Sequence, residues 1–285
     1  MLAGVKINLS LRVGPRRADG YHELASVLAA LPLGDSLELE PAPATHVEAP
    51  GLAGGDALVT RALHLLAAHT GYAAGWQVHI EKRAPVGAGI GGGSADAGAA
   101  LRLANATLAE PLGAGDLLAL AAQVGSDVPF FASGRPAALA RGRGELLEPC
   151  PLAPPAWIVL AWPGVELSTS LVYARYRPAA GAGDRVAQLS AAAFAASGAS
   201  ELAGLVENDL SGAAEELCPP IRRLRERLLG CGALAACMSG SGSAVFGVFD
   251  AEGPARAAHE QLAAQLPWVA LALLPQGDAG ATIKP

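Results

Sequence analysis

The sequence contains no apolar run long enough to cross a membrane, although 52% of its 285 residues are hydrophobic. A membrane-spanning helix needs about 20 consecutive apolar residues, whereas the strongest runs here, 158–162 and 268–274, have the length of buried strands. Positive charge is also sparse: 20 Lys and Arg stand against 26 Asp and Glu, and no dense basic run occurs. These absences disfavour a membrane protein and a nucleic-acid-binding protein.

Cysteine is rare, and its spacing shows none of the close pairs typical of zinc sites. We interpret the four residues, Cys150, Cys218, Cys231 and Cys237, as buried free thiols in a reducing compartment. The first residues alternate apolar and polar side chains and lack the uninterrupted apolar core of a signal peptide. We therefore expect a cytoplasmic protein.

Helix and strand patterns are mixed along the whole chain, which predicts an α+β protein. Apolar and polar residues alternate over 5–13 and place Lys6, Asn8 and Ser10 on one face of a strand. The proline-rich segment 149–155 is interpreted as the connection between two domains, 1–152 and 153–285. The expected strands are 5–13, 37–39, 76–80, 157–162, 233–238, 244–249 and 268–274. The expected helices are 21–30, 56–69, 95–108, 116–124, 168–176, 221–229 and 254–265.

The densest glycine run lies between the strand 76–80 and a helical segment. Glycines let the backbone approach a polyphosphate, and the start of a helix offers it free N–H groups. A Walker loop requires Lys and then Ser or Thr after its last glycine, but Gly93 precedes Ser-Ala here. A dinucleotide match, G-x-G-x-x-G, begins at Gly87, but residues 82–85 separate it from the strand. The run is also compatible with a different kinase loop and with a turn that binds no ligand.

The run Pro-Val-Gly-Ala-Gly-Ile-Gly-Gly-Gly-Ser at 85–94 closely resembles the phosphate loop of the GHMP kinases. The first strand resembles the first motif of that family, and Met-Ser-Gly-Ser-Gly-Ser-Ala at 238–244 resembles its C-terminal glycine motif. The resemblance implies a two-domain GHMP kinase fold, with an N-terminal domain like ribosomal protein S5 and a ferredoxin-like C-terminal α/β sandwich. It also implies an active site between the domains, with ATP and Mg²⁺ as cofactors.

Within that family, segments 6–9, 17–24 and 125–131 resemble one branch. That branch transfers phosphate from ATP to the 2-hydroxyl of a cytidyl sugar alcohol in isoprenoid precursor biosynthesis. The resemblance implies that Asp127 is the catalytic base and Lys6 the catalytic lysine. It implies substrate contacts from Asn8, Tyr21, His22, Thr169, Tyr173 and Gly240. It implies ATP contacts from Pro85, Val86, Gly87, Ala88, Gly89, Ile90, Gly91, Gly92, Gly93, Ser94 and Ala95.

The residue patterns alone leave other roles open. Asp127 fits a helix cap, Lys6 fits a solvated lysine, and Ser94 fits either the N-cap of the next helix or, by family analogy, an Mg²⁺ ligand. Ala57 stands where the family commonly has asparagine, which leaves an adenine contact there open.

Three other functions remain compatible with the sequence. The chain could be a GHMP kinase of the homoserine or mevalonate type, an NAD(P)-binding oxidoreductase, or an inactive GHMP homologue that binds ligand. The partner that we expect is a small molecule, and the sequence is compatible with a monomer or a homodimer.

Overall fold

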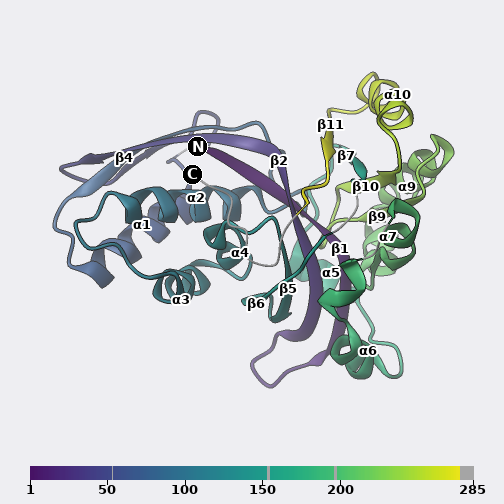
Figure 1. The fold of residues 1–285 in the computed structure, drawn as a ribbon, viewed down its shortest axis with the longest axis horizontal. Helices are drawn as coiled ribbons and strands as arrows, with labels where there is room; N and C mark the ends of the chain where they lie inside the picture. The colour runs from purple at the N-terminus through teal and green to yellow at the C-terminus, as the bar shows by residue number, and fades with distance from the viewer. Residues whose placement is uncertain (53, 153–154, 196–197, 277–285) are drawn as a thin grey trace.

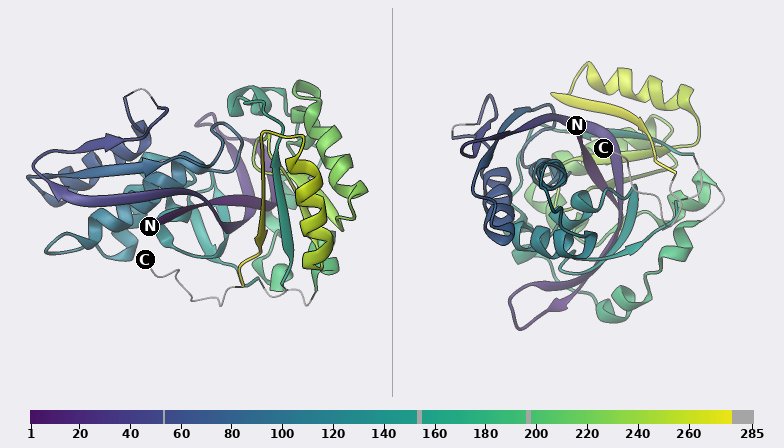
Figure 2. Two further views of the ribbon diagram at one scale, coloured as in Figure 1. Left: turned by 90° about the horizontal axis from the view of Figure 1, so that it is seen from above. Right: turned by 60° about the vertical axis from the view of Figure 1, so that its left-hand side comes forward.

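The computed structural model describes the chain except for residues 53, 153–154, 196–197 and 277–285. Within the described residues the chain forms two β-sheets that lie side by side, each with its own helices (Figures 1 and 2). Among these residues, no helix combines the length and the apolar character that crossing a membrane requires.

The larger sheet has seven strands in the described part of the chain, with the central order β3-β4-β2-β1-β8 and with β5 and β6 extending from β2. Helices α1 to α4 pack along one side of it (Figure 1). The strands are β1 (Leu2–Arg16), β2 (His22–Ala42), β3 (His46–Glu48), β4 (Gly75–Glu81), β5 (Ala137–Gly142), β6 (Leu146–Pro149) and β8 (Glu207–Asn208). The helices are α1 (Ala57–Thr70), α2 (Gly92–Ala106), α3 (Ala114–Val124) and α4 (Val128–Ser133).

The smaller sheet has the order β11-β7-β10-β9 among the described residues. Helices α9 and α10 cover its outer side, away from the larger sheet (Figures 1 and 2). The strands are β7 (Trp157–Trp162), β9 (Ala235–Met238), β10 (Val245–Phe249) and β11 (Trp268–Leu273). The helices of the second half are α5 (Thr169–Arg175), α6 (Ala182–Gln188), the 3-10 helix η1 (Ala191–Ala195), α7 (Ala199–Leu205), α8 (Ser211–Leu217), α9 (Pro220–Gly230) and α10 (Glu252–Ala263). Of these, α6 packs against β1 and β2 of the larger sheet.

An apolar core joins the two sheets. Alternate residues of β1, including Val5 and Ile7, pack in one cluster with Ile158 of β7 and Phe246 of β10. Strand β8 of the second half adds a parallel partner to β1, with Ser10 opposite Glu207. The domain boundary at 152 remains a prediction, and residues 153–154 of the proline-rich connection lie outside the described residues.

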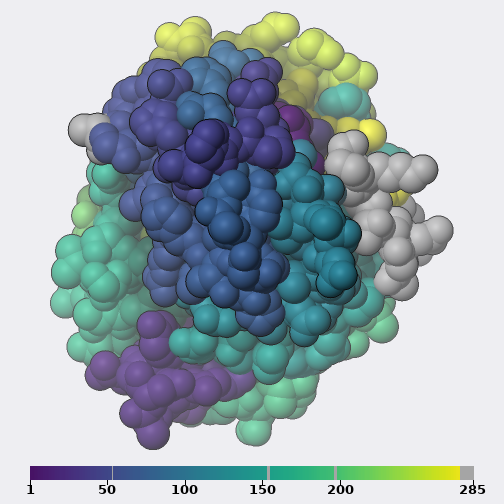
Figure 3. All heavy atoms as spheres, turned by 90° about the vertical axis from the view of Figure 1, so that its left-hand side faces the viewer, coloured from purple at the N-terminus to yellow at the C-terminus, as the bar shows by residue number. Residues whose placement is uncertain are grey.

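Most sequence-predicted elements are confirmed, with ends that shift by a few residues. Asp56 caps α1 as expected, since its carboxylate accepts hydrogen bonds from the N–H groups of Leu58 and Val59. The helix expected at 21–30 is wrong, because this segment and the expected strand 37–39 both belong to β2. The residues of this segment favour a helix in isolation, but their backbone forms strand pairs with β1 on one side and β5 on the other. The turn that precedes β2 protrudes from the body, in purple at the lower left of Figure 3.

Candidate active site

A cavity of about 1460 Å³ opens between the two halves of the chain. Its walls come from β1, β2, the glycine-rich loop before α2, the segment before α4, helix α5 and the turn between β9 and β10. The predicted site residues in these walls are Lys6, Asn8, Tyr21, His22, Pro85, Val86, Gly87, Ala88, Gly89, Ile90, Gly91, Gly92, Gly93, Ser94, Asp127, Thr169, Tyr173 and Gly240. Ala95 does not line the cavity: it is buried in α2, and its N–H donates to the Gly91 carbonyl at 2.8 Å.

The glycine-rich loop is held on both sides by backbone hydrogen bonds. The N–H of Lys6 donates to the Ile90 carbonyl, and the N–H of Ala244 donates to the Ala88 carbonyl, each at 2.9 Å. At three positions the backbone of the loop adopts the left-handed conformation, which glycine takes without strain. The three residues are Gly87, Gly89 and Gly91, with φ of 68°, 77° and 75°.

Helix α2 begins directly in the cavity wall. The prediction that Ser94 caps it is wrong, because the helix starts at Gly92 with Gly91 in the N-cap position and no capping side chain. The left-handed Gly91 turns the chain into the helix earlier than expected. The first N–H groups of a helix have no partner within it and carry a partial positive charge, so this end of α2 suits an anion.

Lys6 is the charged centre of the site. Its ammonium group donates to the Asn8 side-chain oxygen at 2.6 Å and to the Gly89 carbonyl at 3.0 Å. It also lies 3.7 Å from a carboxylate oxygen of Asp127. The Lys6 side chain is 5% exposed and that of Asp127 is 38% exposed. Asp127 occupies the N-cap position of α4 but makes no capping hydrogen bond, so its carboxylate faces Lys6 and the cavity.

The second glycine turn packs directly against the first. A side-chain carbon added at Gly240 would lie 2.8 Å from the Gly89 carbonyl oxygen and 3.0 Å from the Lys6 nitrogen. Next to it, the hydroxyls of Thr169 and Ser241 are hydrogen-bonded at 2.7 Å. The second glycine turn therefore forms the cavity wall next to Lys6, and the bond between Ser241 and Thr169 connects this turn to α5.

Aromatic side chains form the end of the cavity at the β1–β2 turn. The Tyr173 and His22 rings lie 5.5 Å apart, and His22 is oriented by its contact of 2.8 Å with the Gly14 carbonyl. Burial raises the pKa of the Tyr173 phenol. Tyr21 is 53% exposed, with the Arg143 guanidinium 5.0 Å from its ring centre. Arg143 is a cavity residue that the sequence reasoning missed.

Comparison with known proteins identifies the family of this site. Family models for the N-terminal and C-terminal domains of GHMP kinases match residues 57–135 and 190–267. The 4-diphosphocytidyl-2-C-methyl-D-erythritol kinase of Syntrophotalea carbinolica is 39% identical over 283 residues, which cover 97% of this chain and 99% of that relative. The chain belongs to the GHMP kinase family. The same-named enzyme of Thermus thermophilus is 41% identical, with 98% of each chain covered.

Solved structures confirm the expected two-domain fold of this GHMP kinase. A crystal structure of 4-(cytidine 5'-diphospho)-2C-methyl-D-erythritol kinase matches with a TM-score of 0.81 and 38% identity, covering 97% of this chain and 99% of that one. A mevalonate kinase from L. major in complex with R-mevalonate has a TM-score of 0.74 at 16% identity, with 96% and 94% covered, and so shares the fold. The protein is an ATP-dependent small-molecule kinase, and the oxidoreductase hypothesis is wrong.

Next to the glycine-rich loop, this GHMP kinase has a buried ion cluster that the sequence reasoning did not assemble. The Lys82 nitrogen lies 2.6 Å from an Asp35 oxygen, 2.5 Å from an Asp96 oxygen and 4.0 Å from an Asp56 oxygen. The second Asp35 oxygen accepts from the backbone N–H groups of residues 83 and 84. The cluster thereby connects β2, the α1 cap, the end of β4 and α2. The scarcity of lysine in the sequence is the signal that could have drawn attention to Lys82.

Asp96 should make the stability of the kinase depend on pH. Burial raises its pKa to about 7, above the 3.8 expected in the unfolded chain. The folded state then binds the proton more tightly, so this contribution to stability is complete below about pH 4 and is lost as pH rises toward 7. We expect the free energy of unfolding of the wild type, relative to Asp96→Asn, to fall by about 2–3 kcal/mol between pH 4.5 and 7.5.

Urea unfolding at several pH values measures this difference. Asp116→Asn, which changes an exposed carboxylate in the first turn of α3, is the matched control. Its difference from the wild type should stay nearly constant with pH. Parallel curves for the wild type and Asp96→Asn would contradict the prediction.

Proposed function

We propose that this kinase transfers the γ-phosphoryl group of ATP to the 2-hydroxyl of 4-diphosphocytidyl-2-C-methyl-D-erythritol, a step in non-mevalonate isoprenoid precursor biosynthesis. The observation that carries the proposal is the Lys6–Asp127 pair, 3.7 Å apart, in a cavity with a glycine-rich loop and an aromatic end. Relatives that match nearly the whole chain at about 40% identity carry this enzyme name.

In the proposed reaction, Asp127 accepts the proton of the substrate hydroxyl as its oxygen attacks the γ-phosphorus. The bond from that phosphorus to the bridging oxygen breaks, and ADP leaves with the electron pair. Lys6 is placed to stabilise the negative charge on the transferring group, because its ammonium is nearly buried and lies beside Asp127. Asn8 accepts a hydrogen bond from the Lys6 ammonium and also lines the cavity in which the substrate would bind.

ATP binding is proposed to rely on backbone groups more than on net charge. The chain carries a net charge of −6, which repels a polyanion at long range. The loop 85–94 and the N-terminal end of the 15-residue helix α2 offer N–H groups and a positive dipole at short range. The adenine end would lie near Ala57, which lines the cavity.

Mg²⁺ is part of the proposal as the partner of ATP. The described residues contain no group of three or more His, Cys, Asp or Glu side chains able to hold a metal. Mg²⁺ bound to ATP takes most of its ligands from phosphates and water, so a site with few protein ligands fits it. Ser94, in the cavity wall at the start of α2, is the side chain that would contribute. The ion would neutralise phosphate charge during transfer.

The cytosine is proposed to lie at the aromatic end, between Tyr21 and Tyr173 and next to His22. We expect Tyr173→Ala to raise the KM for the cytidyl substrate by about tenfold or more, since stacking contributes about 1–3 kcal/mol per base. The KM for ATP should change little, because the phosphate loop lies elsewhere in the cavity. Steady-state kinetics with each substrate varied in turn measures both values. Equal increases in the two KM values would contradict the stacking role.

A coupled assay of ADP release tests the function. The enzyme is assayed with Mg·ATP and with 4-diphosphocytidyl-2-C-methyl-D-erythritol, homoserine or mevalonate in parallel. Turnover with the cytidyl substrate alone would support the proposal, and turnover with either of the others would redirect it to that class of GHMP kinase. ATP binding without turnover on any substrate would indicate a non-catalytic homologue.

Location and assembly are also proposals. All four cysteines, each in the described part of the chain, are free thiols, which fits the reducing environment of the cytoplasm. A monomer or a homodimer is proposed, and analytical ultracentrifugation of the full chain distinguishes the two.

A further inference from the structure

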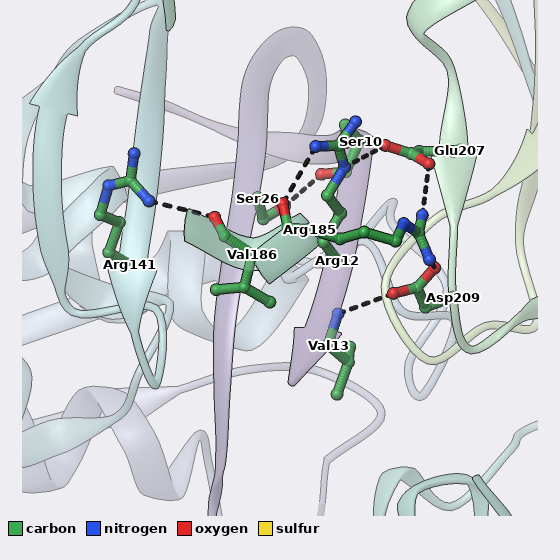
Figure 4. Close-up of polar contacts among 9 residues, drawn as sticks. All are labelled: Ser10, Arg12, Val13, Ser26, Arg141, Arg185, Val186, Glu207 and Asp209. Atoms are coloured by element: carbon green, nitrogen blue, oxygen red, sulfur yellow. Dashed lines mark hydrogen bonds and ion pairs between the residues drawn. The ribbon is translucent and has the colours of Figure 1, made fainter. Parts of the chain in front are cut away.

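A nearly buried chain of hydrogen bonds continues from Lys6 along the cavity wall, which Asn8 and Ser26 both line. The Asn8 amide nitrogen donates to the Ser26 hydroxyl at 2.8 Å, and that hydroxyl donates to the Ser10 carbonyl at 2.7 Å. Figure 4 shows Ser26 on β2 next to Ser10 on β1. Ser26 is 1% exposed and Asn8 is 5% exposed, so water has little access to either group.

The direction of these bonds follows from the chemistry of one hydroxyl. A serine hydroxyl has a single proton, and a carbonyl oxygen can only accept. Because Ser26 gives its proton to the Ser10 carbonyl, its oxygen must accept from Asn8. The NH₂ group of Asn8 therefore faces Ser26, and its oxygen faces Lys6, which has only donors to offer.

We propose that Ser26 is a positioning residue for phosphoryl transfer, which fixes the Asn8 amide so that its oxygen holds the Lys6 ammonium. The inference rests on the proposed function, in which Lys6 acts on the transferring group. An ammonium has three N–H donors. Asn8 and the Gly89 carbonyl take two of them, and the third is left for Asp127 and the phosphoryl group.

The strand geometry supports a specific orienting role for Ser26. The pairing of β1 with β2 shifts register between Asn8 and Ser10, which is a β-bulge. Bulges re-aim side chains and are common beside active sites. Here the bulge places the Asn8 side chain and the Ser10 carbonyl on the same hydroxyl of β2, so removal of that hydroxyl leaves both without their buried partner.

Ser10, whose carbonyl accepts the Ser26 hydrogen bond, provides a matched control. Its own hydroxyl is buried and bonds to Glu207 at 3.2 Å, within the group of Arg12 and Arg185 (Figure 4). Ser10→Ala removes this hydroxyl but keeps the backbone carbonyl that Ser26 requires. The two variants thus each delete one buried hydroxyl, and only Ser26→Ala breaks the connection to Asn8.

The test compares Ser26→Ala, Ser26→Thr and Ser10→Ala in the coupled assay, with thermal unfolding as a check on folding. We expect Ser26→Ala to lower kcat by about tenfold or more, with both KM values within about twofold of the wild type and a melting temperature close to that of Ser10→Ala. Ser26→Thr, which keeps the hydroxyl, should retain most of the kcat. Equal kcat values for Ser26→Ala and Ser10→Ala would overturn the inference.

A double-mutant cycle with Asn8→Ala tests the route of the effect. If Ser26 acts through Asn8, then Ser26→Ala should have no further effect on kcat in the Asn8→Ala background. Additive losses would overturn the inference. The variant Lys6→Met distinguishes failure of the Ser26 inference from failure of the proposed function. Full activity of Lys6→Met would refute the role of Lys6. An inactive Lys6→Met together with an unaffected Ser26→Ala would refute only the role of Ser26.

Discussion

Asp127→Asn is expected to lower kcat by about 10²- to 10⁴-fold, the contribution typical of a general base. Asparagine has the same shape as aspartate but does not accept the proton of the attacking hydroxyl. The ATP phosphates are proposed to bind the glycine-rich loop and the start of α2, so the KM for ATP should change much less. Because the Asp127 side chain is 38% exposed and makes no capping bond to α4, the variant should fold normally.

The coupled assay under saturating substrates measures this loss. Asp184→Asn, an exposed carboxylate in the first turn of α6, is the control for the change of one charge. It should keep the activity of the wild type. An Asp127→Asn enzyme that retained more than a tenth of the wild-type kcat would require another base.

Gly89→Ala is expected to remove most activity and to destabilise the fold. Its side-chain carbon would lie 2.5 Å from the Ser239 carbonyl oxygen and 2.7 Å from the Gly242 carbonyl oxygen. These are backbone atoms, so the glycine-rich loop and the second glycine turn would have to separate. A displacement of about 1 Å at a reacting group can lower the rate about 10²-fold. The left-handed conformation, at φ +77°, adds about 1–2 kcal/mol of strain for alanine.

Kinetics and urea unfolding of the same preparation measure both effects. Gly115→Ala is the matched control, because among the described residues its added carbon would meet nothing beyond its own stretch of α3 within 4 Å. Alanine is the better helix former, so this variant should be as stable as the wild type or more stable. A fully active and fully stable Gly89→Ala enzyme would show that the two turns tolerate separation.

Local patterns predicted the elements that depend on local interactions. Alternation over 5–13 marked β1, the glycine run marked the turn into α2, and Asp56 marked the start of α1, because each of these follows from periodicity or from a neighbour within four residues. The helix expected at 21–30 failed for the opposite reason. Its residues favour a helix in isolation, but two neighbouring strands pair with them in the folded protein.

The sequence alone determined the chemistry that the kinase has available: Lys6, Asp127, the loop 85–94 and the turn at 239–243 are all visible without a structure. Only the tertiary structure decided which of these groups meet. Lys6 lies beside Asp127, and Lys82 beside three aspartates, because strands and helices far apart in the chain pack together. The contact between Ser26 and Asn8 could not be predicted from the sequence either, since it forms between two paired strands at a β-bulge. Distances of this kind depend on packing between elements, which no local pattern encodes.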